Sequence, residues 1–195
     1  WSSVFLTIGS DHFKGGGSGT TEISVSGDVV GSGSESEGIQ TEGSASTIIV
    51  STSASVSGVA EGIETDSKAD IVTVNGSVTG LNGTAILLGG GNDTVNLGTT
   101  ATITGTIDGG TGSDTASFSV AKSAVDSFTY DDTTKTAVVT VDSTVTTFKD
   151  FEYFKFSDDT SAMTTAAAVT TLTKVILTES IGALSVVNSG TSTAP

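Results

Sequence analysis

Short runs in which apolar and small polar residues alternate recur along the chain. An aspartate opens such a run at Asp70, Asp93 and Asp114, at intervals of 23 and 21 residues. Alternation with a period of two indicates a strand with one buried face. Self-similarity at a fixed period of roughly 20 to 50 residues is typical of solenoids. The pattern therefore predicts an all-β fold, a right-handed parallel β-helix or β-solenoid, whose aspartates align along one edge.

A second four-residue motif, called here the phrase, recurs at a similar spacing. It consists of a small polar residue, Val or Ile, another small polar residue, and glycine. It occurs at residues 24–27, 55–58, 77–80 and 102–105, and Gly62-Ile63 matches residues 84–86 one coil later. Glycine can end each strand because it readily takes positive φ. A single coil has too little apolar surface to form a core, but stacked coils bury a shared column of Val, Ile and Leu. We expect four or five coils, with residues 31–43 as a protruding Gly/Ser/Glu loop.

These patterns divide the chain into four parts. Residues 1–19 hold an N-terminal strand and a Gly-rich loop, and residues 20–118 form the parallel β-helix. Residues 119–160 form a small C-terminal β cap with two strands joined by a turn at 131–135, and four of the eight phenylalanines lie in residues 148–159. Residues 161–195 form a tail with one strand candidate at 174–187. Short turns of helix are expected only at 161–168 and 119–127.

The charge narrows the range of partners. The formal net charge is −15, with 22 acidic residues against seven Lys and Arg, and there is no cysteine. Such a chain repels nucleic-acid phosphates and anionic lipids and attracts divalent cations. No apolar run approaches the roughly 20 residues of a membrane span. We therefore expect no nucleic-acid partner, no membrane insertion, and no disulfide or thiolate metal site.

Two glycine-rich turns have the composition of a calcium site. Residues 109–116, GGTGSDTA, fit the nonapeptide G-G-x-G-x-D-x-U-x with Ala116 at the apolar position, and residues 89–95, GGGNDTV, fit it more loosely. Glycines let a turn expose carbonyl oxygens and aspartate adds a carboxylate, whereas Ca²⁺ takes six to eight oxygen ligands. The candidate Ca²⁺ ligands are Gly89, Gly91, Asn92, Asp93, Asp108, Gly110, Gly112 and Asp114. The alternative is that these are ordinary Gly-Asp turns without a metal.

With these turns, the chain resembles the RTX (repeat-in-toxin) family of calcium-binding secreted proteins. Residues 151–160, FEYFKFSDDT, are also similar to the segment that often follows RTX repeats. The resemblance implies type I secretion, a right-handed β-roll or β-helix, and folding driven by extracellular calcium. RTX rolls repeat every nine residues, whereas these turns lie 21 apart. The coils are more similar to the large β-helices of S-layer and adhesin proteins, and we expect one or two ions rather than a row.

No catalytic set is evident. His12 is the only histidine and lies in a Gly-rich stretch, and the adjacent carboxylates Asp131-Asp132 and Asp158-Asp159 are expected to point apart. Thr-x-Thr phrases such as residues 102–104 could form a flat hydroxyl array suited to ice, but they are more often the outward face of a strand.

The sequence thus predicts a non-enzymatic, calcium-stabilised structural or adhesive unit of a secreted bacterial surface protein, extracellular or at the cell surface. Expected partners are further copies or neighbouring segments of the surface protein. Strand addition through residues 3–8 and 174–187 would give head-to-tail fibres. The alternative is a calcium-dependent carbohydrate-binding module of a polysaccharide-modifying enzyme, with a glycan as partner.

Overall fold

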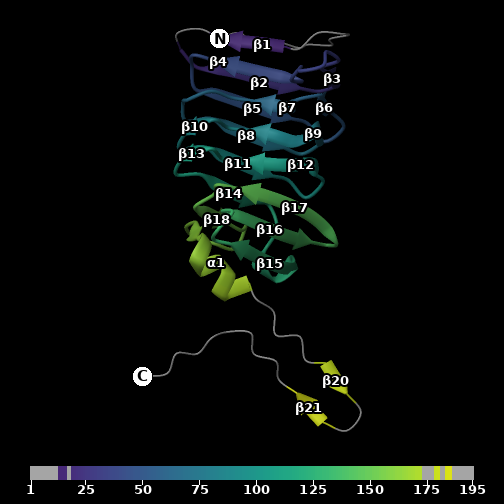
Figure 1. Cartoon of the computed structure of the whole chain (residues 1–195), viewed down its shortest axis with the longest axis vertical. Coiled ribbons are helices and arrows are strands. Elements are labelled where there is room, and N and C mark those ends of the chain that lie inside the picture. Colours follow the sequence, from purple (N-terminus) through teal and green to yellow (C-terminus); the bar gives the residue numbers. More distant parts are fainter. Residues whose placement is uncertain (1–12, 17–18, 173–177, 181–182, 186–195) are drawn as a thin grey trace.

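The computed structural model describes residues 13–16, 19–172, 178–180 and 183–185. The chain is a parallel β-solenoid whose coils stack along its long axis, with a C-terminal cap at one end (Figure 1). The predicted all-β solenoid is confirmed. His12 and the predicted strand at 3–8 lie outside the described residues, as does most of the predicted strand at 174–187.

One face of the solenoid is a seven-stranded sheet in the order β19-β18-β14-β11-β8-β5-β2. Its strands from β2 to β18 pair in parallel, and only the last pair, β18 with β19, is antiparallel. The strands span β2 Thr21–Val25, β5 Ser46–Val50, β8 Ile71–Val74, β11 Thr94–Leu97, β14 Thr115–Phe118, β18 Tyr153–Lys155 and β19 Met163–Thr164. The parallel pairing of β8, β11 and β14 confirms the register predicted from the three aspartates.

A ten-stranded sheet forms the other sides of the coils and continues into the cap. Its order is β1-β4-β7-β9-β12-β17-β16-β15, with β6 pairing both β3 and β9. The strands in the coils span β1 Phe13–Gly16, β3 Asp28–Val30, β4 Ile39–Glu42, β6 Ser55–Gly58, β7 Glu61–Glu64, β9 Ser77–Leu87 and β12 Thr102–Asp108. A third, two-stranded sheet pairs β10 Gly90–Gly91 with β13 Thr111–Gly112 in parallel.

Apolar side chains stack in columns because each strand lies in register with its neighbour in the next coil. One column runs from Ile48 through Val72, Val95 and Ala116 to Phe154. Another runs from Ile39 through Ile63, Ile86 and Ile107 to Phe148. All the members of both columns are fully buried. The coils thus share one continuous core.

The second column corrects the prediction for residues 31–43. The segment does not protrude as a loop, because it contains β4, whose Ile39 is fully buried above Ile63. Thr41 and Ser36 are also buried, and the Ser36 carbonyl accepts the N–H groups of Val59 and Ala60. One isoleucine in the correct register was enough to bring a Gly/Ser/Glu-rich segment into the stack.

The structure also corrects the predicted alignment of the phrase at residues 24–27 with the later phrases. It does not share a column with the phrases at 55–58, 77–80 and 102–105, since Val25 pairs with Val50 on the other sheet. The strand aligned with β6 is β3, which places Asp28 and Val30 opposite Ser55 and Ser57. Among the later phrases the alignment holds, because Val56, Val78 and Ile103 lie in register.

The cap consists of a three-stranded antiparallel meander, a 3₁₀ turn and one α-helix. The strands are β15 Val125–Asp131, β16 Thr136–Val141 and β17 Thr144–Lys149, and β17 pairs in parallel with β12 of the last coil. The turn predicted at 131–135 is present, but the sequence analysis missed β17. The helices are a 3₁₀ turn at Lys122–Ala124 and α1 Thr165–Leu172. In the tail, β20 Thr178–Ser180 pairs antiparallel with β21 Ala183–Ser185, so the described part of the predicted strand is a hairpin.

Phenylalanines close the end of the core, as the aromatic concentration predicted. Phe118 stacks on Phe156 with ring centroids 5.0 Å apart, and Phe128 meets Phe154 edge-on at 4.9 Å. Phe148 and Phe154 are also edge-on, at 5.5 Å. The rings fill the space below the last aliphatic residues, where an unfinished stack would leave an exposed sheet edge.

Candidate functional site

The three periodic aspartates form a continuous hydrogen-bonded column, named here the aspartate ladder: Asp70, Asp93 and Asp114. Each precedes a strand of the seven-stranded sheet and reaches back toward the preceding coil. The Oδ1 atom of Asp93 accepts the N–H of Asp70 at 2.7 Å, and that of Asp114 accepts the N–H of Asp93 at 2.8 Å. The ladder therefore links the coils through one carboxylate per coil.

Both ends of the ladder are closed by residues that the sequence analysis did not single out. At one end Asp70 Oδ1 accepts the N–H of Ser46 at 2.5 Å, and at the other Glu152 Oε2 accepts the N–H of Asp114 at 2.8 Å. Glu152 belongs to the cap, between β17 and β18, so the cap continues the pattern of the coils. It lies 38 residues from Asp114, which is why no period in the sequence points to it.

The second carboxylate oxygen of each ladder residue is buried without a hydrogen-bond partner. These atoms are the Oδ2 atoms of Asp70, Asp93 and Asp114, whose residues are 1%, 1% and 0% exposed. Buried polar atoms are nearly always hydrogen-bonded, and an unpaired one calls for an explanation such as a bound proton or ion. The ladder is therefore both a structural element and a candidate site.

Burial raises the pKa of the ladder carboxyls. It raises the pKa of Asp93 to about 7, against the hydrogen bond from the Asp70 N–H, and the charges of Asp114 and Asp70 add to the rise. It raises the pKa of Asp114 to about 6, opposed by the Asp93 N–H and assisted by the Glu152 charge. The pKa of Asp70 is also raised, chiefly by burial. Without a counter-ion, burial thus favours the protonated form of each ladder carboxyl, and most strongly that of Asp93.

The two glycine-rich turns stack on one another beside the ladder. β10 and β13 pair through Gly90 with Thr111 and Gly91 with Gly112. Gly91 and Gly112 have φ values of +126° and +142°, and a Cβ added to Gly112 would lie 1.5 Å from the Gly91 carbonyl oxygen. Glycine is thus required here for close backbone contact between coils, whether or not a metal is bound.

The other predicted ligands differ in their backbone conformation, hydrogen bonds and ion pairs. Gly89 and Gly110 also have positive φ, and the Gly89 carbonyl accepts the Thr111 N–H at 2.9 Å. Asp108 Oδ1 accepts the Gly110 N–H at 3.0 Å, and its Oδ2 lies 2.7 Å from Lys149 Nζ. Asn92 lies in the turn directly before Asp93. The structure thus places the predicted residues in two adjacent turns, with Asp108 already paired to a lysine.

Within the described residues, no group of three or more His, Cys, Asp or Glu side chains is arranged to hold a metal ion. A cation at the ladder would take one or two carboxylates and complete its shell with backbone carbonyls, which is a donor set that Ca²⁺ accepts. Asp66 lies at the same corner, where its carboxylate accepts the N–H groups of Gly43 and Lys68. The unpaired Oδ2 atoms fit a hard cation better than a soft metal, since every available donor is oxygen.

The adjacent carboxylate pairs are used in local structure. Asp131 accepts the Thr133 N–H at 2.8 Å and Asp132 pairs with Lys135 at 2.7 Å, both within an exposed turn. Asp159 pairs with Lys122, and Asp158 accepts the Lys122 N–H at 3.0 Å. The first pair thus stabilises a hairpin turn, and the second ties the aromatic segment to the 3₁₀ turn.

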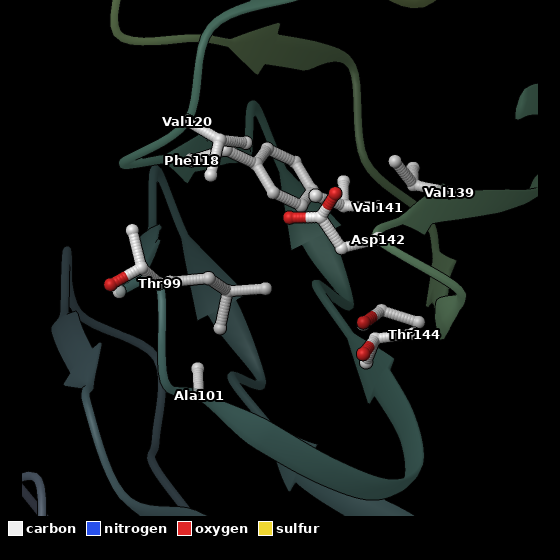
Figure 2. A pocket seen from close by; sticks show the side chains of 11 residues that line it. Thr99, Ala101, Phe118, Val120, Val139, Val141, Asp142 and Thr144 are labelled. Atoms are coloured by element: carbon white, nitrogen blue, oxygen red, sulfur yellow. The ribbon is translucent and has the colours of Figure 1, made fainter. Parts of the chain in front are cut away.

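A small cavity lies between the last coil and the cap (Figure 2). It has a volume of about 130 Å³, and its lining includes Phe118 and Val139. In Figure 2, Thr99 and Ala101 line one side, and Asp142 lies at the turn between β16 and β17 on the other. The lining also includes Thr144 and Thr146, so the cavity is partly polar. No pattern in the sequence indicated it, because its walls come from three separate segments.

Comparisons with known proteins do not assign the chain to a family. No protein family matches the chain, and neither a curated protein nor a solved structure matches it. No helix in the described part of the chain has the length and apolar character needed to cross a membrane. Any assignment of function therefore depends on the structure itself.

Proposed function

We propose that this chain is a calcium-stabilised structural or adhesive unit of a secreted bacterial surface protein, without enzymatic activity. The observation that carries the proposal is the aspartate ladder, with three buried carboxylates whose Oδ2 atoms lack a partner, next to two stacked glycine turns. A net charge of −15 favours cation binding further. The stiff rod of stacked coils suits a spacer or scaffold.

The proposed mechanism is linkage between ion binding and folding. The ladder residues and the turn carbonyls of Gly89, Gly91, Gly110 and Gly112 come together only when adjacent coils are stacked. A cation that binds the folded coils and not the unfolded chain stabilises the fold in proportion to the logarithm of its concentration. Extracellular calcium would thus hold the rod folded, and calcium-poor solution would loosen it.

Thermal unfolding with and without calcium tests this proposal. The melting temperature, followed by circular dichroism at pH 7.5, should rise as calcium is added to protein treated with a chelator, and magnesium should have a smaller effect because it demands tighter octahedral geometry. Asp93→Asn and Asp114→Asn should reduce the calcium response. Asp132→Asn is the matched control, since Asp132 lies on an exposed turn, where it pairs with Lys135. An unchanged melting temperature in chelator would refute the proposal.

A glycan-binding module is the second candidate, and it has less support. Glycan sites commonly use exposed aromatic rings, but the six phenylalanines from Phe118 to Phe156 are buried in the core and cap. Retardation of the protein in gels containing neutral or acidic polysaccharide would separate the two candidates.

A further inference from the structure

The outward side of the seven-stranded sheet carries no charge over its four central strands, β5, β8, β11 and β14. We name this surface the neutral face. Register places its residues in two columns, four rows deep. The first column is Thr47, Ile71, Thr94 and Thr115, and the second is Ile49, Thr73, Asn96 and Ser117.

The chain has 22 acidic residues, and the neutral face contrasts with one part of the ten-stranded sheet. The outward residues of the β6, β9 and β12 run are also uncharged, but no isoleucine lies among them; they are Ser55, Ser77, Thr102, Ser57, Thr79 and Thr104. The contrasting part is the outward column along β4, β7, β9, β12 and β17. It includes Gln40 and Leu87 and also carries Glu64, Asp108 and Lys149. Glu61 lies beside it, and its pKa is raised by burial and then by the charges of Glu64 and Glu37. Glu37, Glu61 and Glu64 thus place like charges close together on that part of the ten-stranded sheet, and a second acidic molecule can approach the neutral face more closely.

Two isoleucines give the neutral face an apolar centre. Ile49 is 39% exposed and Ile71 is 43% exposed, on adjacent strands and in different columns. The surrounding positions are mostly Thr, with methyl groups that can also be buried. A flat β-sheet surface of this kind packs well against another sheet.

The ends of the two columns carry opposite charges. Beyond Thr47 the first column begins at Glu22 of β2, and beyond Ser117 the second column ends at Lys155 of β18. Two copies packed face to face with antiparallel long axes would bring Glu22 of each near Lys155 of the other. A parallel arrangement would instead oppose like charges. The face is thus self-complementary under one two-fold operation.

We propose that the neutral face is a self-association surface, on which two copies of this chain pack face to face with antiparallel solenoid axes. The rows from β2 to β18 cover a flat area of about 300 Å² at ordinary strand spacing. That is less than the roughly 800 Å² per partner of a stable complex, so the dimer is weak and should be populated only at high protein concentration. Copies concentrated on a surface would still pair.

Sedimentation velocity on the full chain, at concentrations from about 10 µM to 1 mM in calcium-containing buffer, tests the proposal. The expected result is reversible dimerisation. Ile71→Glu places a charge in the centre of the face and should abolish the dimer. Because Ile71 points outward, circular dichroism should show the fold retained. Glu64→Lys on the ten-stranded sheet is the control. It should leave a dimer of at least wild-type affinity, since it makes the net charge of the chain less negative.

A charge exchange tests the antiparallel geometry separately. Lys155→Glu should weaken the dimer about fivefold, since it replaces two attractive contacts by repulsive ones. Adding Glu22→Lys to that variant should restore the affinity. A protein that stays monomeric to 1 mM, or a dimer unaffected by Ile71→Glu, would overturn the proposal. A monomer that instead adsorbs to ice or neutral polysaccharide would overturn it too, and would assign the face another partner.

Discussion

Replacing Asp93 by asparagine isolates the charge of the ladder from its hydrogen bond. Asparagine keeps an Oδ1 atom to accept the Asp70 N–H, which Asp93 does at 2.7 Å, but it cannot ionise. Folding raises the pKa of Asp93 from its usual 3.8 to about 7. At about 1.4 kcal/mol per pKa unit, keeping this side chain ionised in the folded state costs about 4 kcal/mol.

The sign of the effect of Asp93→Asn on the free energy of unfolding depends on pH. A carboxyl whose pKa is raised by folding contributes stability below its unfolded pKa, and this contribution is lost as pH rises toward the folded pKa. In metal-free protein at pH 8, Asp93→Asn should therefore raise the free energy of unfolding. The asparagine Nδ2 would lie where Oδ2 has no partner, which costs about 1–3 kcal/mol. The net gain at pH 8 should be about 1–3 kcal/mol. At pH 5 Asp93 is protonated in the folded state and ionised in the unfolded state, so only part of the gain remains. The cost of the unpaired Nδ2 should offset that part, and the variant should be no more stable than the wild type.

Urea unfolding in a chelator at pH 5 and pH 8, followed by circular dichroism, measures both values. Asp132→Asn serves as the control, and its effect should be small at either pH. Adding calcium at pH 8 should stabilise the wild-type protein and not Asp93→Asn, so the order of the two stabilities should reverse. If Asp93→Asn destabilises the metal-free protein more at pH 8 than at pH 5, burial does not penalise the charge and the reasoning fails.

Three further predictions concern the ladder, the turns and the cap. In chelator, the wild-type melting temperature should fall as pH rises from about 4 to 7, because the folded pKa values of Asp93 and Asp114 are about 7 and 6. A melting temperature that rises over this pH range would contradict the prediction. Gly112→Ala should lower the free energy of unfolding in urea by about 3 kcal/mol or more, since its Cβ would lie 1.5 Å from the Gly91 carbonyl oxygen. The control Gly83→Ala, whose Cβ would have nothing within 4 Å, should lower it by about 1 kcal/mol because of its φ of +109°. Equal losses would refute the role of the contact between coils. Phe154→Ala should cost about 3–5 kcal/mol by emptying the end of the core, and a loss below about 1 kcal/mol would show that the cap repacks.

The sequence allowed the solenoid to be predicted because its strongest signal is periodic. Asp70, Asp93 and Asp114 mark the start of equivalent strands, and any fold that keeps their register must stack them. The aromatic cap followed from composition, since phenylalanines concentrated at the end of a repeat have few other roles. The calcium ligands were inferred from motif chemistry, and they remain a prediction.

The parts that could not be predicted depend on contacts between distant segments. Ile39 is a single apolar residue in a Gly/Ser-rich stretch, and only its register with Ile63 shows that it is buried. The phrase at 24–27 matches later phrases in sequence but lies on the other sheet, because the first coil distributes its residues differently. Glu152 completes the ladder from the cap without a repeat to mark it. Residue patterns report local periodicity, whereas these positions depend on where each coil turns.

Because the phenylalanines pack at one end, the resistance of the rod to unfolding differs along its length. Each coil contacts only its neighbours, so force or heat can remove coils one at a time. The bulky rings of Phe148, Phe154 and Phe156 are fully buried at the C-terminal end, whereas the first coils are held by smaller Val and Ile side chains. Under tension the molecule should fray from its N-terminal coils toward the ring cluster, with the C-terminal end serving as the anchor that is lost last.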